Sequence, residues 1–417
     1  MNKATANSSS TQHPGIGFGE FVAFIAALMA INALGIDAML PALPDMGRSL
    51  AIAEENQRQW IIAAFVFGFG GAQLIYGPLA DRFGRRPVLL ASISLFVLTS
   101  IVAAFADTFA TMIGARILQG VSSASSRVLA TSVVRDCYSG RRMARVMSLA
   151  FIVFLAVPIL APSIGQIILL LGPWRWIFFV LAGYAAIVVV WASLRMPETL
   201  HPENRRAIAP RELLDAATIV LTNRNSLGYT LGSTLLFGSL LGFINSSQQI
   251  FADTFQAPHL FTTIFALIAG LMGVASYLNS RIVERLGTRR VSHSALIAFI
   301  AVTGAHLLFA ASGFETIWSF ALFQSITMAC IALAGSNFGS MAMEPVGHIA
   351  GTASSIQGFV STVGGAVIGL LIGQGFNGST VPLATGCLIV GLLALAVVLI
   401  TERGRLFRAH HAPPASQ

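Results

Sequence analysis

Twelve apolar stretches, each long enough to cross a lipid bilayer, alternate with short polar segments along the chain. A transmembrane helix needs about 20 apolar residues, because the hydrocarbon core is about 30 Å thick. Only 10% of the residues are charged, against roughly 25% in a typical soluble domain. The sequence therefore predicts an all-α integral membrane protein with 12 transmembrane helices. The expected spans cover residues 17–40, 59–79, 88–106, 110–134, 146–171, 175–195, 227–250, 261–280, 291–312, 316–338, 349–373 and 382–401.

The basic residues are concentrated on one side of this topology. When alternate loops are assigned to the two sides of the membrane, one set together with both termini holds 20 of the 25 Lys and Arg residues, and the other set holds 3. Short cytoplasmic loops are enriched in Lys and Arg. We therefore expect both termini to lie in the cytoplasm.

A polar segment between the sixth and seventh spans divides the chain into two halves. A weak repeat supports this division, since an acid, an Arg, a Gly and paired Arg residues recur in 81–86 and in 284–290, after the second and eighth spans. Parallel repeats of six helices are typical of one large class of transporters. The expected organisation is an N-terminal tail at 1–16, a six-helix bundle at 17–195, a linker at 196–226, a second six-helix bundle at 227–401 and a C-terminal tail at 402–417.

Several other classes of protein are disfavoured. The basic residues fall in short clusters between apolar runs and form no basic stripe interleaved with aromatic residues, so no nucleic-acid partner is expected. The three cysteines, Cys137, Cys330 and Cys387, form no CxxC pair, so neither a metal nor a disulfide framework is expected. The spans contain no HExxH motif, no Ser/His/Asp set and no phosphate-binding glycine loop. We expect no cofactor and no enzymatic activity.

Three segments resemble signatures of the major facilitator superfamily. Gly77-Pro78-Leu79-Ala80-Asp81-Arg82-Phe83-Gly84-Arg85-Arg86 matches the loop signature that follows the second span of that superfamily. Arg116-Ile117-Leu118-Gln119-Gly120 matches its fourth-span signature. Pro158-Ile159-Leu160-Ala161-Pro162-Ser163-Ile164-Gly165 is similar to the fifth-span signature of its drug:proton antiporters, although Ala161 and Gln166 stand where many members have glycine. Segments 37–44 and 350–355 resemble the bicyclomycin-resistance (Bcr/CflA) group.

The resemblance implies a proton-coupled antiporter built from two six-helix bundles. Such a protein exports small amphipathic drugs or toxic compounds by alternating access, acts in a bacterial inner membrane, contributes to antibiotic resistance and is expected to be a monomer. Its partners are the substrates, protons and the lipid bilayer. The alternative is a proton-coupled transporter of one metabolite, such as a sugar, an amino acid or an organic anion.

The resemblance also assigns two groups of residues. The loop after the second span would act as a conformational gate, through Gly77, Asp81, Arg82, Gly84, Arg85 and Arg86. The alternative to a gate is a charged loop that only sets the orientation of the helices in the membrane. The kinked fifth span, with Pro158, Pro162 and Gly165, would seal the path against leak. An ordinary proline kink is the alternative there.

Asp37 is the only carboxylate expected deep within a span. A charged side chain there costs at least about 2.5–3.5 kcal/mol, and such residues usually face a cavity or a partner. Removal from water favours the neutral acid, so this carboxyl group could take up a proton from one side of the membrane and release it to the other. The alternative is a structural aspartate that is hydrogen-bonded near the outer face.

Arg116 is expected near this proton site, together with Asn32 and Gln119. An arginine cannot be neutralised, so it needs an anionic partner or a polar cavity. The alternative is a fixed hydrogen bond to the backbone of the first or second span. We expect Arg127, among several serines, to be structural and near the cytoplasmic mouth. His306 is expected to be a buried histidine with a hydrogen-bond partner, not a proton relay.

Overall fold

The computed structural model describes residues 15–205 and 210–407. Twelve long helices make up most of this part of the chain. They are α1 (Phe18–Asp37), α3 (Trp60–Phe83), α4 (Arg85–Ala104), α5 (Phe109–Cys137), α6 (Gly140–Leu171), α7 (Arg175–Arg195), α9 (Arg224–Gln249), α10 (Phe261–Leu286), α11 (Thr288–Ala311), α12 (Ile317–Met343), α13 (Ala350–Gln374) and α14 (Val381–Thr401).

The long helices correspond to the predicted membrane spans. Among the described residues, nine segments are long and apolar enough to cross a membrane, and one of them, Ile317–Gln374, contains both α12 and α13. The two long helices outside these segments are α5, which carries Arg116 and Arg127, and α6, whose described apolar part is Ala156–Leu171. The prediction of an all-α membrane protein is confirmed.

The first span ends earlier than its apolar run suggests. We expected it to extend to residue 40, but α1 stops at Asp37 and the chain continues through a 3-10 turn, Leu40–Ala42, into the short helix α2 (Leu43–Ser49). Pro41 and Pro44 stand in the first turns of these two elements, where proline is tolerated because the missing N–H has no partner there in any helix. Asp37 is therefore the last residue of its helix.

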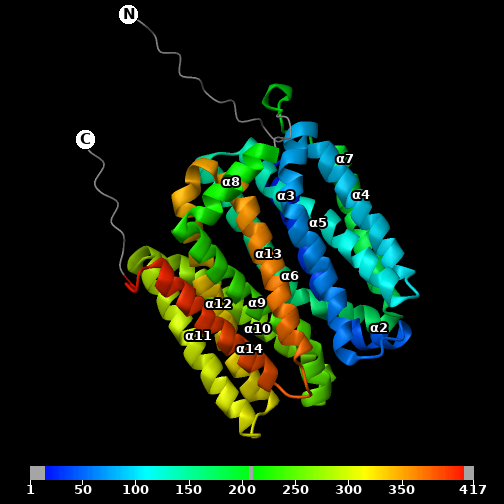
Figure 1. Ribbon diagram of the computed structural model, residues 1–417. Coiled ribbons are helices and arrows are strands. Elements are labelled where there is room, and N and C mark those ends of the chain that lie inside the picture. The colour runs from blue at the N-terminus through cyan, green and yellow to red at the C-terminus, as the bar shows by residue number, and fades with distance from the viewer. Residues whose placement is uncertain (1–14, 206–209, 408–417) are drawn as a thin grey trace, which may run out of the picture.

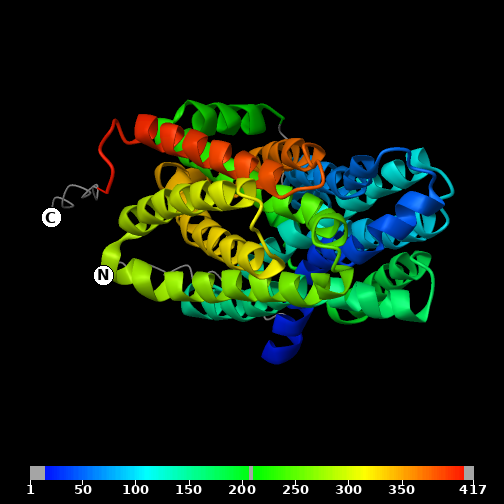
Figure 2. The same ribbon diagram turned by 90° about the horizontal axis from the view of Figure 1, so that it is seen from below.

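The helices form two bundles that lie side by side. α1 to α7 make the first half and α9 to α14 the second, and the short helix α8 (Pro210–Thr222) lies in the linker between them (Figures 1 and 2). We call the face that carries α8 and the ends of α7 and α14 the linker face. The other, which carries α2, is the opposite face.

The sequence repeat becomes a repeated turn in the structure. Gly84 ends α3 and precedes α4 with φ +101°, and Gly287 ends α10 and precedes α11 with φ +83°. Residues with side chains rarely adopt such φ values, which explains glycine at both positions. The two halves thus share the same tight helix-to-helix connection at the linker face.

Glycine also allows α3 and α5 to pack backbone against backbone. A Cβ atom at Gly120 would overlap the carbonyl oxygen of Phe65, and one at Gly68 would overlap that of Ile117. Small residues permit this approach in membrane bundles. The contact fixes the helix that carries Arg116 and Arg127 against the second span.

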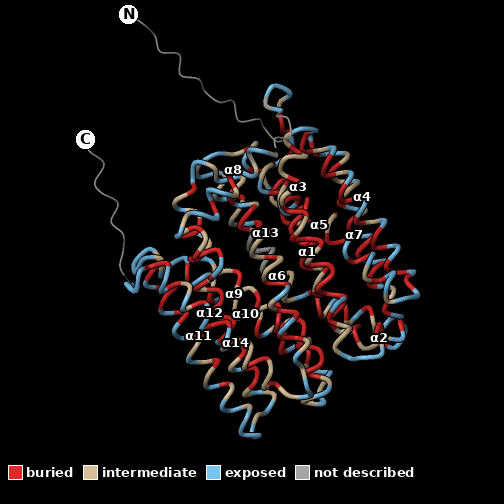
Figure 3. Tube along the Cα trace, in the orientation of Figure 1, coloured by how far each residue is buried: buried red, intermediate tan, exposed pale blue. Residues whose placement is uncertain are grey.

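The exposed sides of the outer helices are apolar. Leu170 and Leu308 are each 76% exposed and Ile400 is 72% exposed, whereas buried residues gather inside each bundle (Figure 3). Contiguous apolar surface of this kind needs a lipid environment. The halves meet where α3 packs on α13 and α6 packs on α10.

Candidate functional site

Arg116 lies fully buried inside the first half, where backbone carbonyls satisfy its guanidinium group. Its Nε donates to the carbonyl oxygen of Ile61 at 3.0 Å, and its Nη2 donates to that of Gly35 at 2.8 Å. Its guanidinium carbon lies 4.5 Å from the centroid of the Phe65 ring. Arg116 therefore ties together α1, α3 and α5 in the way that a fixed helix–helix contact would.

Gln119 and Asn32 extend this polar region across three helices. Gln119 accepts a hydrogen bond from Arg116 and donates one to the hydroxyl of Ser100 on α4 at 2.6 Å. Asn32 on α1 donates to Ser126 on α5 at 2.9 Å, and its Oδ1 has no hydrogen-bond partner among the described residues. The structure thus joins Arg116 and Gln119 directly, whereas Asn32 forms a separate pair with Ser126 on the same helix α5.

Asp37 is close to this region in the chain but makes no ion pair with Arg116. Asp37 is 5% exposed, and its Oδ1 has no hydrogen-bond partner in the described structure. Arg116 instead binds the carbonyl oxygen of Gly35, two residues earlier on the same helix. Asp37 is therefore a buried carboxyl group without a counter-charge.

The proline-containing helix α6 packs directly on the segment that follows Asp37. Pro158 and Pro162 both lie inside α6, which continues through them as one helix. A Cβ atom at Gly165 would overlap the carbonyl oxygen of Ala38 and would come within 3.2 Å of Pro41. The signature residues of the fifth span therefore border the end of α1.

At the linker face of the first half, Arg85 is the centre of a charged cluster. Its Nη1 lies 2.6 Å from Asp81 and its Nε lies 3.1 Å from Asp136 on α5. Thr199 donates a further hydrogen bond to Asp136 at 3.2 Å. The cluster joins the ends of α3, α4 and α5 with the segment after α7.

Glu198 caps the helix that begins in this cluster. Its carboxylate accepts hydrogen bonds from the backbone N–H groups of Arg85 at 2.9 Å and Arg86 at 3.2 Å. These groups belong to the first turn of α4, where backbone donors have no partner within the helix and a negative charge is favoured. Glu198 also approaches Gly84 so closely that a Cβ there would overlap its Oε2.

We expect Glu198→Ala to lower the melting temperature of the purified protein by a few degrees. The variant leaves two partly buried N–H groups without the acceptor that they have in the wild type, and loss of a helix cap costs about 0.5–2 kcal/mol. Thermal unfolding in detergent measures the effect. Glu203→Ala is the matched control, because Glu203 lies in the same segment, is exposed and has no hydrogen-bond or ion-pair partner in the described structure. An equal loss of stability in both variants would contradict the capping role.

The remaining residues of the loop signature behave differently from one another. Arg86 donates to the carbonyl oxygen of Ser193 at 2.6 Å, while Arg82 is exposed and lies over the ring of Phe83. We expected Gly77 to allow a close approach between helices, but no described atom of another helix lies within 4 Å of the place that its Cβ would occupy. In this conformation, close packing does not explain the glycine.

The second half contains a related cluster around Glu402. Glu402, just after α14, accepts hydrogen bonds from Tyr229 and from Nε of Arg289 at 2.8 Å, and Arg289 lies 4.0 Å from Glu344. Burial acts to raise the pKa of Glu402, but the hydrogen bonds from Tyr229 and Arg289 outweigh it and hold this pKa below its ordinary value. Each bundle therefore ends in a glutamate that fastens the first turn of its third helix.

Amide side chains join the two halves near the opposite face. Nε2 of Gln59 lies 2.7 Å from Oε1 of Gln249 and 2.9 Å from the carbonyl oxygen of Gly373. Gln249 in turn donates to Asn56 at 2.8 Å, and Gln374 donates to the carbonyl oxygen of Asn56 at 2.7 Å. We call Asn56, Gln59, Gln249 and Gln374 the amide network.

The amide network dominates the polar contacts between the halves. In the described ranges, the only other side-chain hydrogen bond between them joins Gln73 to Thr362 at 3.0 Å, further along α3 and α13. A cavity of about 660 Å³ lies beside the network, and its lining includes Arg58, Gln248 and Asp253. The halves are therefore held together by neutral hydrogen bonds at the opposite face.

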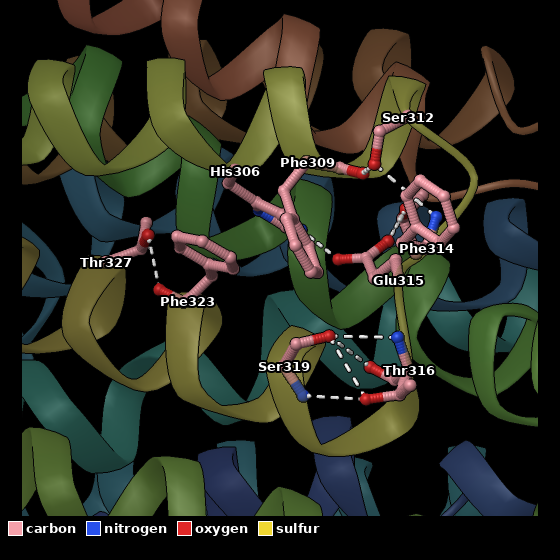
Figure 4. A network of polar contacts seen from close by, with 10 residues as sticks. His306, Phe309, Ser312, Phe314, Glu315, Thr316, Ser319, Phe323 and Thr327 are labelled. Atoms are coloured by element: carbon pink, nitrogen blue, oxygen red, sulfur yellow. Dashed lines mark hydrogen bonds and ion pairs between the residues drawn. The ribbon is translucent and has the colours of Figure 1, made fainter.

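His306 forms a separate buried pair in the second half. Its Nε2 lies 2.7 Å from Glu315, which also accepts a hydrogen bond from Thr380, and its ring stacks on that of Phe323 with centroids 5.1 Å apart (Figure 4). The prediction of a buried histidine with a partner is confirmed. No group of three His, Cys, Asp or Glu residues that could hold a metal occurs in the described ranges 15–205 and 210–407.

The sequence analysis missed several of these residues. The roles of Glu198 and Asp136 were not foreseen, although a glutamate directly after the last span of each half was a usable signal. The amide network was also missed, because uncharged amides near the ends of spans are common. Arg127 is exposed and has no ion pair among the residues that the structure describes, so its expected structural role stays a prediction.

The comparison with known proteins gives consistent results. The model of the Major Facilitator Superfamily matches residues 25–369. The bicyclomycin resistance protein homolog of Haemophilus influenzae is 27% identical over 90% of this chain and 94% of its own length. YdgK of Bacillus subtilis, an uncharacterized MFS-type transporter, is 30% identical over 84% of this chain and 88% of its own. The multidrug resistance protein MdtL of Escherichia coli is 28% identical over 92% of this chain and 96% of its own length.

Two solved structures share the fold. The D-xylose-proton symporter superposes with a TM-score of 0.73 at 12% identity, covering 93% of this chain and 99% of that one. The human organic anion transporter MFSD10 superposes with a TM-score of 0.65 at 19% identity, covering 92% of this chain and 100% of that one. At these identities the likeness concerns the arrangement of the helices alone.

Proposed function

The chain belongs to the Major Facilitator Superfamily, a family of transporters, and from this premise we propose that it exports small amphipathic compounds, drugs among them, in exchange for protons. Relatives named for bicyclomycin resistance and for multidrug resistance match it over nearly their whole length. We place it in a bacterial inner membrane as a monomer with the linker face and both termini toward the cytoplasm, as the distribution of basic residues favours. It needs no catalytic step and no cofactor.

The single observation that carries this proposal is the buried Asp37 carboxyl group without a counter-charge. An isolated ionised carboxylate is costly to bury, and such a group avoids the cost by remaining protonated. When water reaches Asp37 in another conformation, the proton can leave. Arg116, held two residues away at Gly35, stabilises the end of α1 and adds positive potential that favours release.

Asn32 and Gln119 complete the proposed proton site. Both are fixed by hydroxyl groups, through Ser126 and Ser100, so α1, α4 and α5 keep one arrangement while Asp37 changes its charge. α6 with Pro158, Pro162 and Gly165 packs on Ala38, which places the proposed seal against the same end of α1. A change at Asp37 therefore acts directly on the interface that α6 forms with α10.

Alternating access needs a closing contact on each side of the membrane. At the opposite face the amide network holds the halves together, through Gln59 and Gln249 among others. At the linker face we propose that the loop with Gly77, Asp81, Arg82, Gly84, Arg85 and Arg86 contacts the second half in the alternative state and stabilises it, while the contacts of Arg85 within the first half are kept. The cost of exchanging one set of contacts for the other sets the equilibrium between the two states.

We expect a pump-deficient bacterial host that expresses the protein to accumulate several-fold less of its substrates than the same host with an empty vector. Proton entry supplies about 2.3 kcal/mol per charge for each 100 mV of membrane potential, and the pH gradient adds to this. Accumulation of a panel of fluorescent amphipathic drugs measures the effect. A protonophore should remove the difference at unchanged ATP levels. Persistent export after collapse of the gradient would refute proton coupling. Equal accumulation of every compound with the protein and with the empty vector would refute export.

A further inference from the structure

Arg127 differs from Arg116, although both lie on α5 far from the ends of the helix. Arg127 is 10 residues before the end of α5 at Cys137, which corresponds to roughly 15 Å along the helix axis. Its side chain is exposed, and its guanidinium group makes no hydrogen bond and no ion pair in the described part of the chain. The contact that it does make is with the ring of Phe69, whose centroid lies 5.9 Å from the guanidinium carbon.

Arg127 contacts α3, the helix of the first half that packs on α13 of the second half. Phe69 precedes Gly70, whose Cβ would lie 2.8 Å from Val363 and 3.0 Å from Thr362 on α13. Farther along α5, Nη1 of Arg135 lies 3.6 Å from the place of a Cβ at Gly351, the second residue of α13. α3 packs on both α5 and α13, so it lies between Arg127 and the second half (Figure 1). Arg127 thus lies beside the interface along which the halves must separate.

A charged side chain at this depth has to face water or a ligand, because hydrocarbon does not solvate it. The charges around it do not neutralise it. The central parts of the six long helices of the second half contain no Asp, Glu, Lys or Arg. In the first half the other deep charges are those of Arg116 and Asp37, so the interior carries a net positive charge whether or not Asp37 is protonated. Such an interior repels cations.

We propose that Arg127 and Phe69 bind the transported compound, and that the preferred substrates are amphipathic organic anions with a carboxylate or sulfonate group next to an aromatic ring. The planar guanidinium group offers paired donors that match both anions. The ring of Phe69 lies beside this group; the ring is buried in this conformation and would add an apolar contact once the halves separate. This assignment rests on the proposed export function and names its substrate class.

The anion and the proton would occupy different residues. Ser126, next to Arg127, is bonded to Asn32, and Asp37 lies five residues further along α1, roughly 7–8 Å away by helix rise. In this exchange the anion leaves the cell while the proton enters it. Both movements are equivalent to positive charge moving inward, so both are driven by a membrane potential that is negative inside. The membrane potential would therefore drive export of an anion more strongly than export of a neutral compound.

The test uses the full-length protein in lipid nanodiscs and two fluorescent probes of the same size, pyrenebutyrate and a pyrenebutyl trimethylammonium ion. Wild-type protein should bind the carboxylate at least several-fold more tightly than the ammonium probe. Arg127→Gln should weaken carboxylate binding roughly 10- to 100-fold, the value expected for a lost charge-assisted hydrogen bond, and leave a neutral pyrenebutyramide probe unaffected. Arg127→Lys should restore part of the loss.

Arg135→Gln is the matched control, because it removes an exposed positive charge from the same helix nearer the linker face. Equal losses in both variants would overturn the assignment to Arg127, as would a preference of the wild type for the ammonium probe. If Arg127→Gln proves unstable in thermal unfolding, the affinity of Arg127→Lys relative to the wild type decides the question. Binding in nanodiscs needs no proton gradient, so a failure of proton-driven export would be recognised separately.

Discussion

The Asp37→Asn variant is expected to lose proton-coupled export completely while it still reaches the membrane in folded form. Asparagine has nearly the same size as aspartate and is neutral, like the protonated acid, so it should favour the conformations that protonated Asp37 favours. It cannot release a proton, and each cycle would then move substrate without a proton. Transport against a gradient should cease, and downhill exchange of substrate should persist.

Inverted membrane vesicles with an internal pH-sensitive dye measure this loss. Addition of substrate to wild-type vesicles that hold a respiratory proton gradient should make the vesicle interior less acidic, and the Asn variant should give no response. Glu20→Gln is the matched control. Glu20 lies on the same helix but is paired with Arg195 at 2.8 Å near the linker face, so its loss should leave the response intact. A normal response from Asp37→Asn would assign coupling to another group.

The membrane fold could be predicted from the sequence because the bilayer imposes a strong and simple constraint. Twelve apolar stretches of the required length can form only helices in lipid, and the repeat at Gly84 and Gly287 indicated two equivalent halves. The ends of the helices were less predictable. α1 stops at Asp37 because two prolines follow it, whereas α5 extends to Cys137 because charged residues continue a helix into water.

The candidate site shows why side-chain contacts are harder to predict than buried charges. The sequence identified Arg116 as a charge that needs an anionic partner or a polar cavity, with a hydrogen bond to the backbone of the first or second span as the alternative. Its partners are the carbonyl oxygens of Gly35 and Ile61, which every residue carries and no sequence pattern marks. Arg127 has the same charge and lies on the same helix, yet its side chain is exposed and contacts Phe69 on α3. Only the packing of α3 and α5 distinguishes the two.

In both halves a glutamate after the sixth helix binds the start of the third helix, but the groups that it binds differ. Glu198 binds the backbone donors of α4 directly, whereas Glu402 binds the side chain of Arg289 on α11 and the hydroxyl of Tyr229. Both glutamates fasten the end of their bundle's sixth helix to the start of its third. The linker-face ends of each bundle should therefore move as rigid units. The contacts that change during transport are then those between the halves.

Removal of Gln59 and Gln249 together is expected to open the opposite face. The double variant Gln59→Ala, Gln249→Ala loses the bond between the two amides and those to Gly373 and Asn56. Each hydrogen bond lost between buried groups costs about 1–3 kcal/mol when its partner is left unsatisfied. The ratio of closed to open protein at this face should fall roughly 10- to 100-fold or more.

Spin labels at Ala53 and Asn377, which are exposed on the first and second halves at the opposite face, report this change as a distance distribution. The three native cysteines are buried and would be replaced by serine in the labelled protein. The double variant should shift the population from a short to a long distance. Gln57→Ala in the same turn is the matched control, since Gln57 makes no side-chain hydrogen bond in the described structure. An unchanged distribution in the double variant would show that the apolar contacts of α3 with α13, and not the amide network, keep this face closed.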